Sequence, residues 1–165
     1  MLTPQEIDLV LQTVYDNFTV VDTPEITLEA NPDDVTDAKI SALASSKINR
    51  LSIGIQSFFE EDLKLMNRAH NQTEALDCIT KAKQYFKNIS IDLMYGIPQM
   101  SPQRWQENIE KALSLEVPHI SCYVLTVEPK TALERFIKNG IIRPVDDAVA
   151  AQHHAVLVEK TVAVG

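Results

Sequence analysis

Four polar side chains stand where strand-like apolar runs of this sequence end. Glu29 ends the run ITLE, and Gln56 ends LSIGIQ. Asp92 interrupts ISIDLMYG, and Thr126 ends ISCYVLT. In a sheet of parallel strands, ligands bind beyond the carboxyl ends of the strands, so these side chains would meet at one rim of the sheet. Together they predict a binding site for a polar small molecule.

The chemistry open to this set is recognition rather than acid–base catalysis. The carboxylates of Glu29 and Asp92 can accept hydrogen bonds from an ammonium group or from ribose hydroxyls, and the amide of Gln56 both donates and accepts. Arg68 follows in LKLMNRAHN, after a short expected helix, where a guanidinium can bind a carboxylate through two hydrogen bonds. Each residue alone also fits an ordinary role, such as a helix cap or a surface salt bridge. Their shared position at strand ends favours a site.

Helix-like and strand-like segments alternate along the chain and would position these residues. Thr3, Pro4 and Glu6 form a capping-box pattern before the first helix. Helices are expected over roughly 4–17, 36–46, 60–66, 72–85 and 102–114, and strands within 25–32, 49–56, 88–98 and 119–126. Two further helical pieces cover about 131–138 and 144–162. Strands separated by such helices favour an α/β fold with a parallel sheet of about four strands, which is half a barrel.

Composition limits the classes of protein to which this chain can belong. With 165 residues, 45% of them hydrophobic, the chain can bury the core of one globular domain. Its formal net charge of −8 argues against a broad binding surface for nucleic acid or for an anionic membrane. No apolar run approaches the roughly 18 residues of a membrane-spanning helix, and the N-terminus lacks the pattern of a signal peptide. We therefore expect a cytoplasmic protein with no membrane span and no nucleic-acid partner.

Candidate metal ligands are few. Cys78 and Cys122 are the only two cysteines, which excludes a disulfide framework and a C-x2-C metal motif, and both are expected to be small buried apolar residues. His153 and His154 are adjacent, and adjacent side chains on a helix diverge by roughly 100°, so they do not form a chelating pair. We expect both at solvent-facing or half-buried positions. His70 follows Arg68 in an expected loop and could approach the site.

Several motifs stand in a fixed order along the chain, namely LEANP, NRLSIGIQSF followed by LKLMNRAH, IDLMYGIPQ, and HISCYVLTVEP. In this order and at these distances they resemble the middle of the oxygen-independent coproporphyrinogen III oxidase-like radical S-adenosylmethionine (SAM) enzymes. The resemblance covers about residues 1–163. Leu-Thr-Val-Glu-Pro at 125–129 is more similar to the haem-chaperone branch of that family than to its decarboxylating oxidases.

This resemblance implies a partial TIM-like (β/α) barrel, with SAM lying across the strand ends beside a [4Fe-4S] cluster. In the oxidases, reductive cleavage of SAM yields a 5′-deoxyadenosyl radical that abstracts hydrogen from a propionate side chain of the porphyrinogen. Porphyrinogen or haem is therefore the implied partner. The SAM-contacting positions carried over from the motifs are Glu29, Gln56, Arg68, Asp92 and Thr126. Glu29 suits the methionine ammonium group, and Gln56 and Arg68 suit its carboxylate or nearby hydroxyls.

Two parts of the family pattern have no counterpart in this sequence. The C-x3-C-x2-C cluster motif and the glycine-rich GGGTP-type stretch before the first helix are absent, and Cys78 and Cys122 cannot supply three thiolates. We therefore expect no cluster in this chain. The chain is expected to be one partial barrel domain over 1–165, without the N-terminal cluster-binding segment and the C-terminal domain. Half a barrel leaves unpaired edge strands and apolar surface, which predicts self-association.

Three functions remain open on these grounds. The first is a fragment of a radical SAM protein of porphyrin or haem metabolism, inactive alone and catalytic only in its full-length form. The second is a non-catalytic protein that binds or delivers haem. The third is a cluster-free α/β enzyme that uses Glu29 and Asp92 as acid and base.

Overall fold

Strands and helices alternate in the structure, as the sequence predicts. The computed structural model describes residues 2–164. Its strands are β1 (Thr27–Ala30), β2 (Arg50–Gln56), β3 (Ile89–Tyr95) and β4 (His119–Val124). Its helices are α1 (Pro4–Asn17), η1 (Pro32–Asp34, a 3-10 helix), α2 (Asp37–Ala44), α3 (Glu60–Leu65), α4 (Gln72–Tyr85), α5 (Pro102–Ser114), α6 (Ala132–Lys138) and α7 (Asp147–Val162).

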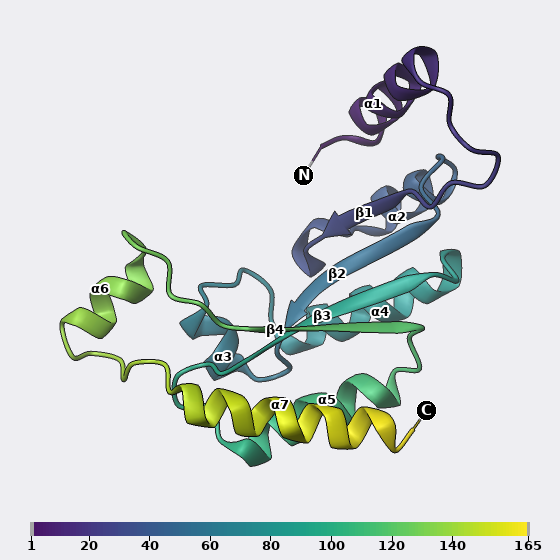
Figure 1. Cartoon of the computed structure of the whole chain (residues 1–165). Helices are drawn as coiled ribbons and strands as arrows, with labels where there is room; N and C mark the ends of the chain where they lie inside the picture. The colour runs from purple at the N-terminus through teal and green to yellow at the C-terminus, as the bar shows by residue number, and fades with distance from the viewer. Residues whose placement is uncertain (1, 165) are drawn as a thin grey trace.

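The four strands form one sheet in the order β1-β2-β3-β4, and every neighbouring pair is parallel. Because every pair is parallel, all the carboxyl ends lie at the same end of the sheet. Figure 1 shows α6 beyond that end, α1 beside the β1 edge, and α7 lying along α5. The predicted fold class, a four-stranded parallel α/β sheet of partial-barrel type, is confirmed.

Local sequence signals set the helix boundaries. At α1, Glu6 N donates to Thr3 Oγ1 at 3.3 Å and Thr3 N donates to Glu6 Oε2 at 2.7 Å, which is the predicted capping box. At α7, the Asp146 side chain accepts hydrogen bonds from the first turn of the helix. The last helix therefore begins at Asp147 rather than near 144, because the aspartate cap determines where its first turn forms.

The apolar core lies between one face of the sheet and the helices. Alternate residues of β2 and β3 are almost completely buried on this face, namely Leu51, Ile53, Ile55, Ile89, Ile91 and Leu93. Trp105 of α5 is fully buried among them. Its Nε1 donates to the His153 backbone oxygen at 2.7 Å, so α5 and α7 are joined inside the core.

His153 is buried, which contradicts the prediction of a solvent-facing or half-buried side chain. None of its surface is exposed, and its Nδ1 accepts a hydrogen bond from Gly96 N at 3.2 Å. His154 is exposed, in agreement with the prediction. The prediction failed at His153 because α7 packs against α5 and β3, and the spacing of residues in an isolated helix does not reveal which partner will cover it.

None of the helices within residues 2–164 combines the length and the apolarity that a membrane span requires.

Candidate functional site

The other face of the sheet carries small and polar side chains. In β2, Ser52, Gly54 and Gln56 alternate with the buried core residues, as the two-residue period of a strand requires. They border a cavity of about 330 Å³ at the carboxyl end of the sheet. The cavity is lined by Glu29, Ala30, Asn31, Ser52, Gly54, Gln56, Arg68 and Asp92. The structure therefore brings together four of the five residues that the sequence predicts to contact SAM.

Gln56 ends β2 in an unusual backbone conformation. Its φ is 68°, in the left-handed region, and Ser57 N donates to Ile55 O at 2.9 Å across it. A γ-turn closed in this way around a residue with positive φ is rare and strained. The turn brings the Gln56 amide back over Gly54, where a Cβ atom would lie 2.8 Å from Gln56 Nε2. Only glycine at position 54 leaves this space for the amide.

Asp92 supplies an oriented carboxylate to the lining of the cavity. Ser52 Oγ lies 3.3 Å from both carboxylate oxygens and can donate to either. Burial raises the pKa of Asp92 above its ordinary value, the proximity of Glu29 adds to this rise, and hydrogen bonds from Ser121 and Ser52 oppose it. The two serines hold the group as an acceptor that faces the cavity.

Arg68 places a cation at the rim of the same cavity. It follows α3, and its backbone N donates to Leu63 O at 2.9 Å, which fixes the chain at the end of that helix. One guanidinium nitrogen, Nη1, donates to Asn31 Oδ1 at 3.3 Å. The remaining guanidinium donors are suited to bind a carboxylate of a ligand.

Thr126 lies outside this cavity. The sequence predicts that Thr126 ends the fourth strand, but β4 ends at Val124. Leu125 N donates to Tyr95 O at 2.9 Å, after which the chain leaves the sheet. Thr126 lines a neighbouring hollow of about 530 Å³, which Arg68 also borders. A contact between Thr126 and SAM stays a prediction.

Four cavity residues were not singled out from the sequence. Ala30 and Asn31 stand in the motif LEANP without a role of their own, and Ser52 and Gly54 were taken as members of an apolar run. A signal for the last two was present, because Ser52, Gly54 and Gln56 occur at every second position between branched aliphatic residues. That alternation is typical of a strand with one polar face.

Comparison with known proteins decides the family. Residues 4–112, more than half of the chain, match the Radical SAM superfamily. This chain belongs to the radical SAM superfamily. It is 31% identical over 159 residues to the heme chaperone HemW of Lactococcus lactis, covering 95% of this chain and 42% of that protein. The heme chaperone HemW of Bacillus subtilis is 34% identical over 145 residues, covering 87% of this chain and 38% of that protein.

The relatives also include a eukaryotic protein and solved structures. Mouse radical S-adenosyl methionine domain-containing protein 1, mitochondrial, is 32% identical over 153 residues, with 92% of this chain and 35% of that protein covered. Coproporphyrinogen III oxidase (HemN) from Escherichia coli superposes with a TM-score of 0.79 at 24% identity, over 98% of this chain and 36% of that chain. Archaeal Methanocaldococcus infernus Elp3 superposes with a TM-score of 0.70 at 21% identity, over 81% of this chain and 32% of that chain. The structures show a shared fold, and the chain spans less than half of each of these proteins.

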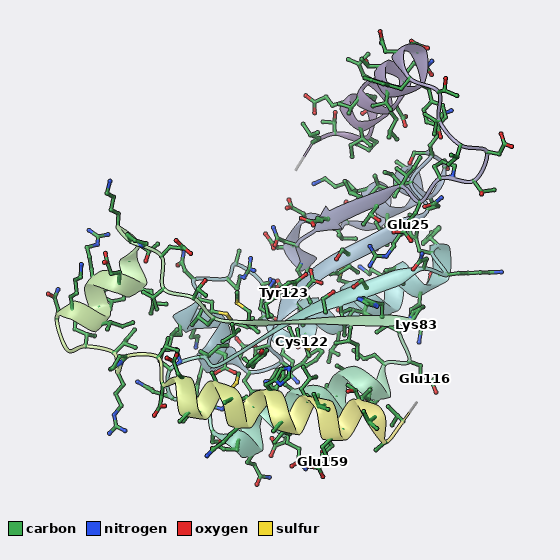
Figure 2. The ribbon with its side chains drawn as sticks, viewed as in Figure 1. Glu25, Lys83, Glu116, Cys122, Tyr123 and Glu159 are labelled. Atoms are coloured by element: carbon green, nitrogen blue, oxygen red, sulfur yellow. The ribbon has the colours of Figure 1, made fainter. Side chains whose placement is uncertain are left out.

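The family implies SAM and a [4Fe-4S] cluster in its full-length members, and the two groups fit this chain differently. SAM fits the cavity, because Gly54 leaves space beside an amide, and two carboxylates and a guanidinium complement an ammonium group, ribose hydroxyls and a carboxylate. The cluster does not fit. Cys78 lies on α4 and Cys122 on β4, beside Tyr123 (Figure 2), and burial raises the pKa of each thiol to about 12. Within residues 2–164, no three His, Cys, Asp or Glu side chains are grouped to hold a metal ion.

Proposed function

We propose that this chain is the SAM-binding part of a radical SAM barrel that acts on a porphyrinogen or haem, and that residues 1–165 form one domain of a larger protein. One observation carries the proposal: Glu29, Gln56, Arg68 and Asp92, from four separate segments, line a single cavity at the carboxyl end of a parallel sheet. That is the position where ligands bind in parallel α/β folds. The sequence match to the superfamily supports it independently.

Each cavity residue has a definite part in holding SAM. Glu29 accepts hydrogen bonds from the ammonium group, Arg68 pairs with the carboxylate, and Asp92 accepts from hydroxyls. Gln56 can donate to one group of the ligand and accept from another, and Gly54 keeps the space beside it open. When bound, SAM supplies the radical chemistry of the family. The residues of this chain bind and orient it.

Calorimetric titration of the 165-residue chain with SAM tests this proposal directly. We expect binding with a Kd of about 1 mM or tighter, and a loss of about tenfold or more in the Arg68→Ala variant because a charged hydrogen bond to the carboxylate is removed. Arg143→Ala is the matched control, since Arg143 is an exposed arginine that lines a different hollow. A folded chain that binds no SAM, or equal losses in the two variants, would contradict the proposal.

Binding of haem without catalysis is a second candidate, favoured by the names of the HemW relatives and by the hollow next to the cavity. The hollow has apolar walls on α6, β3 and the ends of α3 and β4, with Arg68 at its border; these walls include Leu65, Met66, Met94, Leu125, Leu133 and Phe136. A mostly apolar wall beside a cation suits a planar macrocycle with carboxylate side chains.

Absorption titration with haem tests the second candidate. We expect a saturable shift of the main haem band and weaker binding in Phe136→Ser, because Phe136 is 44% exposed and borders the hollow. Val158→Ser is the control, since Val158 is 46% exposed but lies on α7 away from the hollow. Haem binding that the two variants weaken equally would place the haem elsewhere.

Self-association belongs to the same proposal. Within residues 2–164, β1 and β4 each pair along one side only. Apolar side chains on α1, just after it and on β4 are exposed, among them Leu9, Phe18 and Tyr123. An open sheet edge is a template for pairing with another chain. Light scattering at micromolar concentration should give a mass above that of one chain, and the mass of a single chain would contradict self-association. A cytoplasmic location and the lack of a nucleic-acid partner stay predictions from composition.

A further inference from the structure

We infer that His70, Asp62 and Asn108, three buried residues outside the lining of the cavity, are positioning residues that impose the strained turn on Gln56 and so hold its amide over Gly54. The inference rests on the proposed function, because the amide is taken to contact SAM. None of the three residues needs to touch the ligand. Their effect on binding passes through the backbone on either side of Gln56.

The turn itself calls for an outside restraint. A residue with a side chain rarely adopts a positive φ, and strained conformations of this kind persist only where the surrounding structure fixes them. Gln56 has a φ of 68°, and the pairing between β2 and β3 shifts register between Ile53 and Gln56. Glycine would adopt this conformation without strain. Gln56 keeps this conformation although it carries a long amide side chain, and that side chain lines the cavity.

His70 holds the N-terminal side of the turn. Its Nε2 lies 3.1 Å from Ile55 O, and since a carbonyl oxygen only accepts, Nε2 carries the hydrogen and donates it. The same oxygen accepts from Ser57 N and closes the γ-turn. His70 is 3% exposed, and its Nδ1 has no hydrogen-bond partner among the described residues. The Asp33 carboxylate is the nearest charged group to Nδ1, with Oδ1 3.8 Å away, so the bond to Ile55 O is the shortest polar contact of this ring.

Asn108 and Asp62 hold the C-terminal side of the turn. Phe58 N donates to Asn108 Oδ1 at 2.7 Å, and Ser57 Oγ donates to Asp62 Oδ2 at 2.7 Å. Asn108 Nδ2 donates to the Arg104 backbone oxygen at 3.3 Å, which directs the amide oxygen of Asn108 toward the turn.

Both clamping side chains on this side are buried and paired. Asp62 is 2% exposed, and Arg104 Nη1 donates to its Oδ1 at 3.1 Å, so its charge is neutralised inside the protein. Asn108 is fully buried on α5, far in sequence from the turn. The backbone around Gln56 is therefore held from three segments: α3, the loop before α4, and α5. Around Asp62 and Asn108 every buried polar side-chain atom is hydrogen-bonded, and a satisfied polar network of this kind favours one conformation.

The experiment compares the loss of a clamp with the loss of an equally buried histidine elsewhere. His70→Ala, Asn108→Ala and the milder Ser57→Ala each remove one restraint, and His70→Gln keeps a side-chain N–H that can donate to Ile55 O. His153→Ala is the matched control, because His153 is also buried and bonded to the backbone, but at the loop after β3. Two quantities are measured: the φ of Gln56 from NMR couplings in the free chain, and the Kd for SAM by calorimetry.

We expect the alanine variants at 57, 70 and 108 to release Gln56 from its positive φ and to weaken SAM binding at least about fivefold. The Kd of His70→Gln for SAM should stay within about twofold of that of the unchanged chain. The Kd of His153→Ala should do the same, even where this substitution lowers Tm. A released turn with unchanged SAM affinity would overturn the inference, as would weakened binding with φ unchanged or equal weakening by His153→Ala. If the unchanged chain binds no SAM, the proposed function is wrong, whereas the couplings still decide whether these residues hold the turn.

Discussion

The carboxyl ends of β2 and β3 both use a residue with positive φ, for different purposes. Gln56 at the end of β2 has a φ of 68°, and Gly96, just after β3, has a φ of 69°. A buried histidine bonds to the backbone at each place, since His70 lies 3.1 Å from Ile55 O and His153 accepts from Gly96 N at 3.2 Å. The two turns differ in the residue that forms them.

The neighbours of each turn explain that difference. A Cβ atom on Gly96 would lie 3.2 Å from Ala150 Cβ and 3.2 Å from Val124 Cγ2, so the close packing of α7 requires glycine there. Gln56 faces a cavity instead, and its side chain occupies the space over Gly54. In this pair, the turn that packs against α7 is made by glycine, whereas the turn that faces the cavity keeps its side chain and is restrained by a network.

Substitution at Gly96 should have the largest effect on stability. Gly96→Ala forces a Cβ atom into the left-handed region and against Ala150, which we expect to lower the free energy of unfolding by about 2–4 kcal/mol. Urea denaturation measures this, and SAM affinity of the folded fraction should not change. A loss below about 1 kcal/mol would show that α7 can shift to accept the methyl group.

Replacing Gln56 by glycine should separate the effect on stability from the effect on SAM binding. Gln56→Gly removes both the strain and the amide, so we expect the free energy of unfolding to stay within about 1 kcal/mol while SAM binding weakens by about 1–3 kcal/mol. Gln99→Gly is the control, because Gln99 also has a positive φ, of 70°, but borders a different hollow. Equal SAM affinity in the two variants would remove Gln56 from the site.

The turn after β3 should also make the stability of the protein depend on pH. Burial lowers the pKa of His153 below its ordinary value, so the unfolded chain binds a proton here more readily than the folded one. Stability should therefore fall as the pH drops below about 6.5, the ordinary value for histidine, and continue to fall until the folded ring is protonated. His153→Gln should reduce this slope in urea denaturation between pH 7.5 and 5, whereas the exposed His154→Gln should leave it unchanged.

The contrast between the turns also shows what sequence can and cannot predict. Alternating helices and strands follow from local spacing and capping. Glu29, Gln56 and Asp92 were found because strand ends are visible in the pattern, and Arg68 because it follows the next expected helix. The positive φ of Gln56 was not predictable, since Asn108 lies 50 residues from the Phe58 amide that it holds. The buried position of His153 likewise depends on how α7 packs. Contacts between distant segments determine both features, and no local propensity encodes them.

Gly54→Ala should have the smallest effect, and it tests whether the Gln56 amide needs the space over Gly54. A Cβ atom in Gly54→Ala would lie 2.8 Å from Gln56 Nε2 and 3.5 Å from Asn31 Oδ1. Because the amide is the end of a flexible side chain it can move aside, so we expect a change in the free energy of unfolding below about 1 kcal/mol and a loss of about threefold in SAM affinity.

A double-mutant cycle of Gly54→Ala and Gln56→Gly shows whether the amide or the ligand occupies the space over Gly54. If Gly54 acts only by leaving room for the amide, Gly54→Ala should have almost no further effect on SAM binding in a chain that already carries Gln56→Gly. The coupling between the two sites would then equal nearly the whole effect of Gly54→Ala alone. Additive losses would mean instead that the ligand itself occupies the space over Gly54.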